Sequence, residues 1–568
     1  MKSKKVVAVI LVLAMMAALV LSSCGGGDKP AASSDSPANT PAADSDTSGA
    51  SGGGSAEAGQ IVEAALAYSD QILSEISDDA VSSKDSLTFA AISDPGKITL
   101  DNLLEFTQYP IATAAVEYFI RYNFKEAKYY SPVCDSYDTD ADNKGVTFHI
   151  TPGITMNDGN IFGSADLIAS IEAFRIHNGL GWQLDFVDLD KADIIDDNTI
   201  YLPFTFSNGV WESGFQMLTL LSGEAYNAVN GDESFFQAPI GPQAYDVSEW
   251  VAGDHITFTR NDDYYRGTPP IKTLTMKVIS DRTAAYMALQ NGDIDLLWNI
   301  SADQVVSTYN SDNLEQVIMG ENMMIFLGMN SGGNEALKDF RVREAISLAV
   351  NRQDIIDGAY DGLAFPSTSI LTKEAVGYDP AWDTTSTIPA QDVEKAKSLL
   401  ADAGYGDGLT LRLIAESTIN FQLVTEQLAA QLEQVGITLD PQLADYATTN
   451  SIMFSSDVSG YDLFLFVCQT SDDGISTIDN PMLYGATHPE LAGDNAGEGW
   501  FAIFDAIRAA KNIDERVTLY RDLNTYFFEK GEFWVPLAVS QTYVAFDKDL
   551  TGLRRNGFMI YFEDAYYR

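Results

Sequence analysis

The feature that most constrains the fold is a regular alternation of strand-like and helix-like patterns, which continues from residue 85 to the end of the chain. Val146, Phe148 and Ile150 alternate with polar residues, which predicts a half-buried strand. Pro-Gly and Asn-Asp-Gly turns follow. A helix pattern then begins at Ser164, whose side chain can cap it. Alternation of this kind predicts an α/β architecture.

Three more helices are predicted in the C-terminal half, because apolar residues recur on one side of each. One stripe ends at Gly404 and another at Gly436, and glycine is the usual C-terminal cap. The segment 461–468, YDLFLFVC, is apolar almost throughout, which is typical of a strand covered on both faces. The three stripes comprise Val342, Ala345, Ile346 and Ala349; Val393, Ala396, Leu400 and Ala403; and Phe421, Val424, Leu428, Leu432 and Val435.

The N-terminus has the pattern of an export signal. Lysines near the start precede an apolar run over residues 6–21, shorter than the roughly 20 residues that span a bilayer. A transmembrane anchor is the alternative, but no charged cluster follows the run. Leu-Ser-Ser-Cys24 resembles a bacterial lipobox, in which the cysteine is lipidated. We therefore expect a signal peptide at 1–23 and an extracytoplasmic protein, anchored to the cell membrane through Cys24.

Residues 24–58 are predicted to form a flexible tether behind the lipidated cysteine. Most of them are Gly, Ser, Ala, Pro, Thr or Asp, so this segment has little apolar surface to bury. We expect the ordered part to begin near Asp85, where SLTFAAI predicts a first strand. The remaining length suggests about three domains of ~150 residues each.

The charge and the cysteines exclude several classes of protein. A formal net charge of −47 repels nucleic acid, and no basic stripe with interleaved aromatics offsets it. Solubility outside the cell explains this charge better than a preference for cationic ligands. After Cys24 only Cys134 and Cys468 remain, too few for a disulfide framework. They could form one bridge, but two ordinary thiols are the favoured interpretation.

A search for catalytic chemistry finds no motif. The chain has no G-x-S-x-G elbow, no phosphate-binding loop and no dinucleotide fingerprint, and its four histidines are scattered. Residues 138–145, DTDADNKG, imitate half of a calcium loop, but Asn143 and His149 stand where Gly and Glu are needed. A polar turn is the better interpretation. The 81 acidic residues leave a catalytic carboxylate pair open.

Several segments in the right order resemble one protein family. They include VTFHITPGITMNDG in a strand, turn and helix signature, and NGDIDLL after a hairpin and crossover. The family is that of the extracytoplasmic solute-binding proteins of ABC importers, and within it the peptide/nickel-binding group. Its opening strand and turn belong to the scaffold, so His149 and Asp158 need no chemistry. The similar segments are 131–174, 239–297, 326–371, 392–415 and 520–540.

The resemblance implies a class II periplasmic-binding-protein fold with two main lobes, a hinge and an extra lobe. Closure of the hinge would bury a small solute, and the closed form would dock on an ABC permease. It implies no catalysis, no cofactor, no metal and a monomer. The expected ranges are 84–105, 236–329 and 535–568 for main lobe I, 106–235 for the extra lobe and 330–534 for main lobe III.

The resemblance also implies residues that line the cleft. A backbone-bonding loop should follow the first strand, two residues should follow NGDIDLL, and one aromatic should precede the third lobe. Tyr446 stands where an aromatic is common. For Trp298 and Tyr446, core packing is the alternative role. The expected ligand-binding residues are Thr107, Gln108, Tyr109, Trp298, Asn299, Phe326, Tyr446, Cys468, Gln469 and Asp472.

The segment after 461–468 bears most on the choice of ligand. Peptide binders of this family carry Gly-Trp there and then an aspartate that pairs with the peptide's α-amine. Asp472 lies at the matching distance from Tyr461, but Cys468 and Gln469 fall where Gly-Trp is expected. A solvated turn is the alternative role for Asp472.

Three other functions remain open at this point. The same fold could hold a non-peptide solute, such as a nickel chelate or an oligosaccharide, although the few histidines give nickel no support. A secreted hydrolase on an unrecognised scaffold would show turnover. A surface receptor that senses peptides without importing them would lack a permease.

Overall fold

The computed structural model describes residues 58, 60–65, 81–98, 109–123, 128–178, 181–319, 323–453, 458–469, 487–556 and 559–568. By internal contacts the chain divides into residues 1–51 and 52–568, and all the described residues belong to the second unit. The predicted signal peptide, Cys24, Thr107, Gln108 and Asp472 lie outside the described residues.

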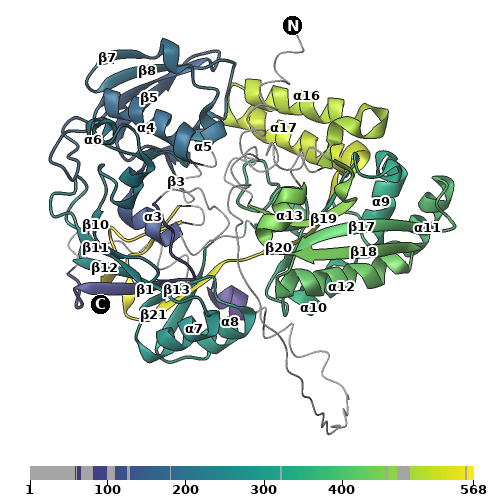
Figure 1. The fold of residues 1–568 in the computed structure, drawn as a ribbon. Helices are drawn as coiled ribbons and strands as arrows, with labels where there is room; N and C mark the ends of the chain where they lie inside the picture. Colours follow the sequence, from purple (N-terminus) through teal and green to yellow (C-terminus); the bar gives the residue numbers. More distant parts are fainter. Residues whose placement is uncertain are drawn as a thin grey trace, which may run out of the picture. The chain divides into compact units, whose positions relative to one another are not determined.

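The first sheet has seven strands in the order β10-β11-β12-β1-β13-β21-β14. In Figure 1, β1, β13 and β21 run side by side although they come from three distant parts of the sequence. β1 is parallel to β12 and β13, whereas β21 is antiparallel to both of its neighbours. The strands are β10 Tyr245–Val251, β11 His255–Arg260, β12 Thr273–Val278, β1 Ser86–Ala91, β13 Leu296–Trp298, β21 Tyr543–Asp547 and β14 Leu314–Ile318.

Short elements cover this sheet. α3 and β24 supply side chains to the same buried core as Leu87 and Phe89 of β1. Helix α7 follows β12, and its N-cap Asp281 accepts a hydrogen bond from the amide of Ala284. The covering elements are α3 Tyr109–Ala115, α7 Arg282–Asn291, α8 Ala302–Tyr309, β22 Leu550–Thr551, β23 Arg554–Asn556, β24 Met559–Tyr561 and β25 Tyr566–Tyr567.

The second sheet has six strands in the order β16-β20-β15-β19-β17-β18. All seven residues of β15 are buried, and β19 pairs with it along its whole length. The predicted strand over 461–468 is thereby confirmed as β19. The strands are β16 Phe365–Pro366, β20 Trp534–Ser540, β15 Met323–Met329, β19 Leu463–Gln469, β17 Leu409–Glu416 and β18 Ile437–Ala444.

The three predicted helical stripes are confirmed. Most of their apolar residues join one buried core beneath the second sheet, and Val393 and Ala403 pack at its edge. Gly404 and Gly436 follow their helices with φ of +94° and +86°, the left-handed conformation that favours glycine. The helices around this sheet are α9 Phe340–Ala349, α10 Arg352–Ala359, α11 Val393–Asp402, α12 Ile419–Glu433, α13 Tyr446–Met453, α16 Ala496–Ala509 and α17 Ile513–Tyr526.

The strand pairing moves two of the expected boundaries. Residues 323–329 and 535–540 were expected in main lobe I with the first sheet, yet β15 and β20 both pair in the second sheet. The chain therefore passes between the sheets at 319–323 and at 540–543. Both strands are buried on both faces, so hydrophobicity along the chain gives no sign of the change of sheet.

A third core surrounds a four-stranded sheet in the order β5-β6-β8-β7. The strand predicted around Phe148 is confirmed as β6, with Val146, Phe148 and Ile150 buried. The helix cap differs from the prediction: Gly163 is the N-cap, and the Ser164 hydroxyl donates to the Asp196 carbonyl. The elements are β2 Glu117–Tyr118, β3 Arg121–Asn123, β4 Lys128–Tyr130, β5 Cys134–Thr139, β6 Gly145–Ile150, α4 Ser164–His177, β7 Asp193–Asp196, β8 Thr199–Pro203, α5 Trp211–Phe215, β9 Thr219–Leu220 and α6 Gly223–Ala228.

The ordered part begins earlier than expected. Residues 60–65 are helical, and Ile61, Val62 and Ala65 are buried, as is Ala58, where the tether was predicted to end. They pack in a cluster with side chains of α7 and β21. Their spacing matches one face of a helix, but the polar, glycine-rich sequence before them concealed the pattern.

Candidate functional site

A small, partly open cavity lies at the carboxyl edge of the first sheet. Its walls come from the ends of β1 and β13, from the residue after β12 and from the first turn of α7. Because β1, β12 and β13 are parallel, their carboxyl ends meet at the same edge. Open α/β sheets bind ligands at this edge. The lining is mostly apolar, and its polar members are Arg282, Trp298, Asn299 and Gln304.

Trp298 and Asn299, both predicted from the sequence, line this cavity together. Trp298 is 1% exposed, and its indole Nε1 is buried without a hydrogen-bond partner. Asn299 is half-buried with φ of +56°, a left-handed conformation that asparagine adopts more readily than most residues. The structure thus brings together one pair of the expected residues.

Arg282 and Gln304 complete the polar lining and were not found from the sequence. Arg282 Nη1 donates to the Asn299 carbonyl at 3.2 Å. Both ends of the Gln304 amide are used: Oε1 accepts from the Ser301 amide at 3.1 Å, and Nε2 donates to the Arg282 carbonyl at 3.4 Å. The one indication of Arg282 in the sequence is its position at the start of a helix that follows a parallel strand.

The other described site residues lie on the second sheet or start helices. Phe326 of β15 is 2% exposed and packs with Phe464, Phe466 and Trp534 in an aromatic cluster. The backbone of Cys468 and Gln469 ends β19, opposite Met324 and Met323 of β15. Tyr109 begins α3 and Tyr446 begins α13.

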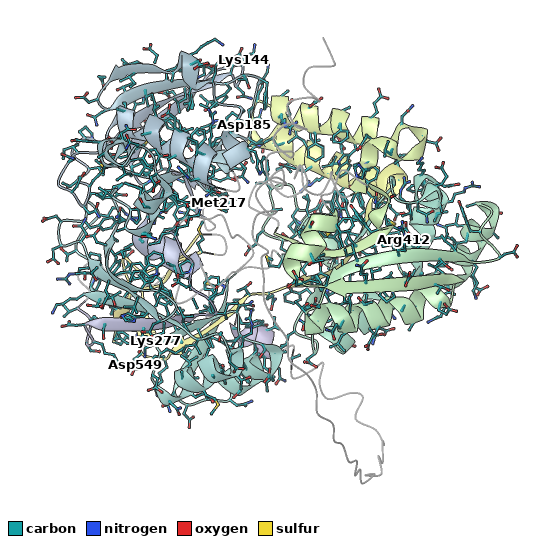
Figure 2. All side chains as sticks on the ribbon, viewed as in Figure 1. Lys144, Asp185, Met217, Lys277, Arg412 and Asp549 are labelled. Carbon is teal, nitrogen blue, oxygen red and sulfur yellow. The ribbon has the colours of Figure 1, made fainter. Side chains whose placement is uncertain are left out.

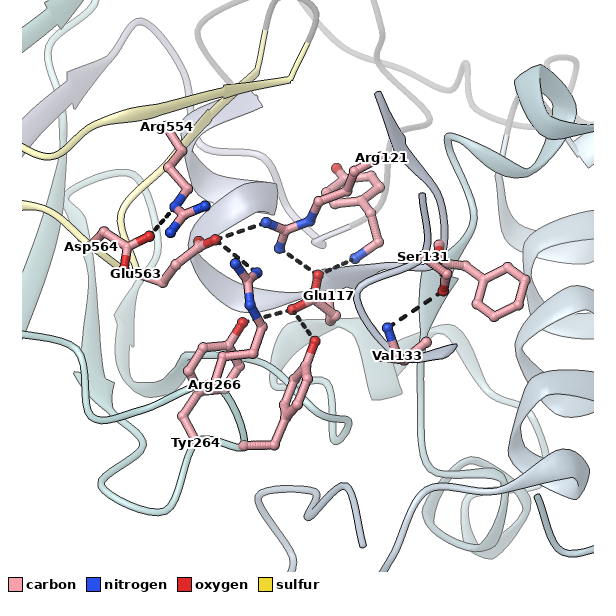
Figure 3. A network of polar contacts seen from close by, with 12 residues as sticks. Glu117, Arg121, Ser131, Val133, Tyr264, Arg266, Arg554, Glu563 and Asp564 are labelled. Atoms are coloured by element: carbon pink, nitrogen blue, oxygen red, sulfur yellow. Dashed lines mark hydrogen bonds and ion pairs between the residues drawn. The ribbon is translucent and has the colours of Figure 1, made fainter. Parts of the chain in front are cut away.

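A buried charged network joins β2, β3 and the C-terminal residues to the first sheet (Figure 3). Arg121 pairs with Glu117 and, through Nη1, with Glu563 Oε1 at 2.7 Å. Arg266 reaches the same Glu563 oxygen at 3.1 Å. The Tyr264 hydroxyl donates to Glu117 Oε2 at 2.8 Å.

Burial and pairing oppose each other in this network. The side chains of Glu117, Arg121 and Glu563 are 2%, 3% and 5% exposed. Burial by itself would raise the pKa of Glu563, but Arg121 and Arg266 outweigh it and lower that pKa to about 2. The Arg121 guanidinium also lies 3.8 Å from the centre of the Tyr561 ring. The network is therefore a structural junction with all three charges paired.

A second junction joins the loop before α5 to the turn between α16 and α17. The Gly209 amide donates to the Arg508 carbonyl at 2.7 Å, and Arg516 Nη1 donates to the Gly209 carbonyl at 2.5 Å. Asn143 Nδ2 donates to the Ala510 carbonyl at 2.8 Å. A β-carbon at Gly209 would stand 2.5 Å from that carbonyl oxygen, so this close approach requires glycine.

The described residues contain no group of three or more His, Cys, Asp or Glu side chains that could hold a metal ion. In the calcium-like segment, Asp138 contacts His149 and Asp140 accepts a hydrogen bond from the Tyr201 hydroxyl. Cys134 is a free thiol, and burial raises its pKa to about 12. It therefore does not bridge to Cys468.

The comparisons with known proteins agree with this arrangement. Residues 128–477 match the family described as bacterial extracellular solute-binding proteins, family 5 Middle. The glutathione-binding protein GsiB of Pectobacterium atrosepticum is 25% identical over 441 residues, which cover 75% of this chain and 84% of the relative.

Two solved structures show the same fold. The ABC transporter substrate-binding protein CtaP of Listeria monocytogenes has a TM-score of 0.73 at 20% identity, over 85% of this chain and 99% of that one. The periplasmic binding protein DppA of Helicobacter pylori, in complex with the peptide STSA, has a TM-score of 0.69 at 17% identity, over 85% and 98%.

The family match decides the class of protein. Within the described residues, no helix is both long and apolar enough to cross a membrane. The family consists of extracytoplasmic substrate-binding components of ABC importers, which are not enzymes, so the hydrolase alternative is dropped. The chain belongs to the bacterial extracellular solute-binding proteins of family 5, the peptide/nickel group of the class II periplasmic-binding-protein fold.

Proposed function

We propose that the protein is a membrane-tethered receptor that captures a peptide and delivers it to an ABC permease. The observation that carries the proposal is the cavity at the carboxyl edge of the first sheet, with its apolar walls and few polar groups. The relative GsiB is named for binding glutathione, and the DppA structure contains a peptide. A non-peptide solute in the same fold, such as a nickel chelate or an oligosaccharide, is the alternative.

We assign the first sheet to main lobe I and the second sheet to main lobe III. The extra lobe is the unit built on β5 to β8. In this scheme the crossings at 319–323 and 540–543 form the hinge. Closure would bring the residues expected near the ends of β1 and β19 toward one solute, among them Tyr109 and Asp472. Its free energy would come from contacts made only in the closed form.

We further propose that the tether ends in a lipid anchor at Cys24, with the protein itself a monomer. An acyl chain contributes about 0.8 kcal/mol for each buried CH₂ group, so two chains hold a soluble protein at a membrane. Cys24→Ala should release the protein into the medium without changing its unfolding transition. Cell fractionation measures this release. A variant that stays in the membrane fraction would contradict lipid anchoring at Cys24.

The ligand is tested by mass spectrometry of the small molecules that a tetherless protein retains through purification and releases on denaturation. A ladder of short peptides supports the peptide receptor, and their shared features would define what the pocket requires. A single non-peptide species would keep the transport role but replace the ligand. A neighbouring gene that encodes a permease would favour import over sensing.

A further inference from the structure

Residues 60–65 form a short helix that follows the predicted tether, and we call this helix the strap. It is the purple helix beside α8 in Figure 1. Ile61, Val62 and Ala65 are at most 6% exposed, whereas Ala64, on another face of the helix, is exposed. A helix this short is marginal in isolation, so its order depends on what the three buried side chains contact.

The apolar cluster that contains these side chains lies at both places where the chain passes between the sheets. Ile318 is the last residue of β14 before the crossing at 319–323. Tyr543 is the first residue of β21 after the crossing at 540–543. The two residues are paired across β14 and β21. The strap is therefore packed in the same cluster as one end of each crossing of the proposed hinge.

The same cluster also draws side chains from the other side of the hinge. Leu363 and the partly buried Phe365 belong to it, and Phe365 begins β16, which pairs with β20 in the second sheet. Most of the remaining members come from α7, α8 and the first sheet. Because protein interiors are close-packed, a rotation at the crossings that moves Leu363 relative to α8 must change the packing around the strap.

We propose that docking of the strap is coupled to closure of the lobes, an inference that rests on the proposed function and its hinge. The second junction joins the unit built on β5 to β8, which the buried charged network ties to the first sheet, to α16 and α17 beside the second sheet. Strap and junction are both in place in the same structure, so the docked strap stabilises the arrangement in which the junction is formed. The tether would then meet the protein at its hinge.

The test measures amide hydrogen exchange in the full chain and in two variants of the strap. Ile61→Ser removes a fully buried side chain, and Ala64→Ser introduces the same residue on the exposed face as a matched control. We expect Ile61→Ser to accelerate exchange within 60–65 and, by about fivefold or more, at the Gly209 amide. That amide donates to the Arg508 carbonyl in the second junction, far from the strap in the sequence. Ala64→Ser should change neither rate.

A reference amide and a reverse experiment complete the test. Arg412 of β17, labelled in Figure 2, donates its amide to Asp462 Oδ2 at 2.8 Å, and none of the described residues of β17 belongs to the strap's cluster. Its exchange should stay the same in every variant. Coupling between two sites is reciprocal, so Gly209→Ala, which disturbs the second junction, should accelerate exchange within 60–65. This variant decides the matter even if Ile61→Ser fails to fold.

The outcomes separate the strap from the proposed function. Exchange that rises within 60–65 but not at Gly209 would overturn the coupling and leave the strap as a local contact. An equal rise at Gly209 and Arg412 would overturn it too, because the variant would then be destabilised as a whole. Co-purified peptides with no change at Gly209 would keep the receptor and remove the coupling. A coupled strap in a protein that retains only a non-peptide solute would keep the coupling and contradict the peptide receptor.

Discussion

The unit built on β5 to β8 contacts the rest of the described chain at two junctions that differ in their chemistry. At the first, Arg121, Glu117 and Glu563 form a buried charged network, and the chain itself continues from β2 into the unit. At the second, Gly209 and Asn143 contact the end of α16, the following turn and α17 through a few hydrogen bonds, two of which come from the Asn143 side-chain amide and the Arg516 guanidinium. No covalent connection is close there, because Gly209 and Arg508 are far apart in the sequence.

The difference shows which junction can open. Separating the first would break charge-assisted hydrogen bonds among nearly fully buried side chains, and the chain itself runs through this junction. Separating the second breaks a few hydrogen bonds, whose groups water would then satisfy at a net cost of about 1 kcal/mol each, and uncovers one apolar side chain, Val210. We therefore expect the first junction to be permanent and the second to make and break as the proposed lobes close and open.

The largest effect should follow the loss of Arg121. Arg121→Ala leaves Glu117 buried without its ion-pair partner and Glu563 with Arg266 alone, so we expect the free energy of unfolding to fall by about 3–5 kcal/mol. Denaturant unfolding measures this. Arg341→Ala is the control, because Arg341 pairs with Asp339 at the surface and should cost less than about 1 kcal/mol. Equal losses in the two variants would show that the buried network adds no special stability.

Acid should act on the same junction. Because the folded pKa of Glu563 is about 2, against 4.5 ordinarily, its pairing stabilises the fold above pH 4.5 and is lost as the pH falls toward 2. The loss should approach roughly 3 kcal/mol. We expect Glu563→Gln to flatten this part of the pH–stability curve. Thermal unfolding between pH 2 and pH 6 tests it, and an unchanged slope in the variant would place the acid sensitivity elsewhere.

The smallest change in stability should come from Gly209→Ala. The new β-carbon would meet the Ala510 carbonyl, so the second junction should loosen while unfolding changes by about 1 kcal/mol. If the junction belongs to the closed form, affinity for the co-purified solute should fall several-fold. Calorimetry measures this, with Gly460→Ala as the control because its β-carbon meets nothing nearer than 3.5 Å. Unchanged affinity would indicate that the second junction, like the first, does not open and close with the lobes.

Local patterns predicted individual elements well, because each element buries one face. The stripe from Phe421 to Leu432 became α12, and the alternation around Phe148 became β6. The pairing of strands that are distant in the sequence was not predicted, because nothing in the local sequence of β15 or β20 indicates which sheet each strand joins. In the candidate site, Trp298 and Asn299 were predicted from the family resemblance. Arg282 was missed because an exposed arginine that begins a helix looks like any surface residue.

The position of β20 and β21 has a consequence for the order of folding. β21 lies between β13 and β14, and β20 lies between β16 and β15, so both sheets are incomplete until residues 534–547 are present. Contacts between such distant segments slow folding, because a long loop must close before the contact forms. A nascent or truncated chain therefore cannot complete either sheet, and folding is delayed until nearly the whole chain is present. That delay suits a protein that crosses a membrane before it works.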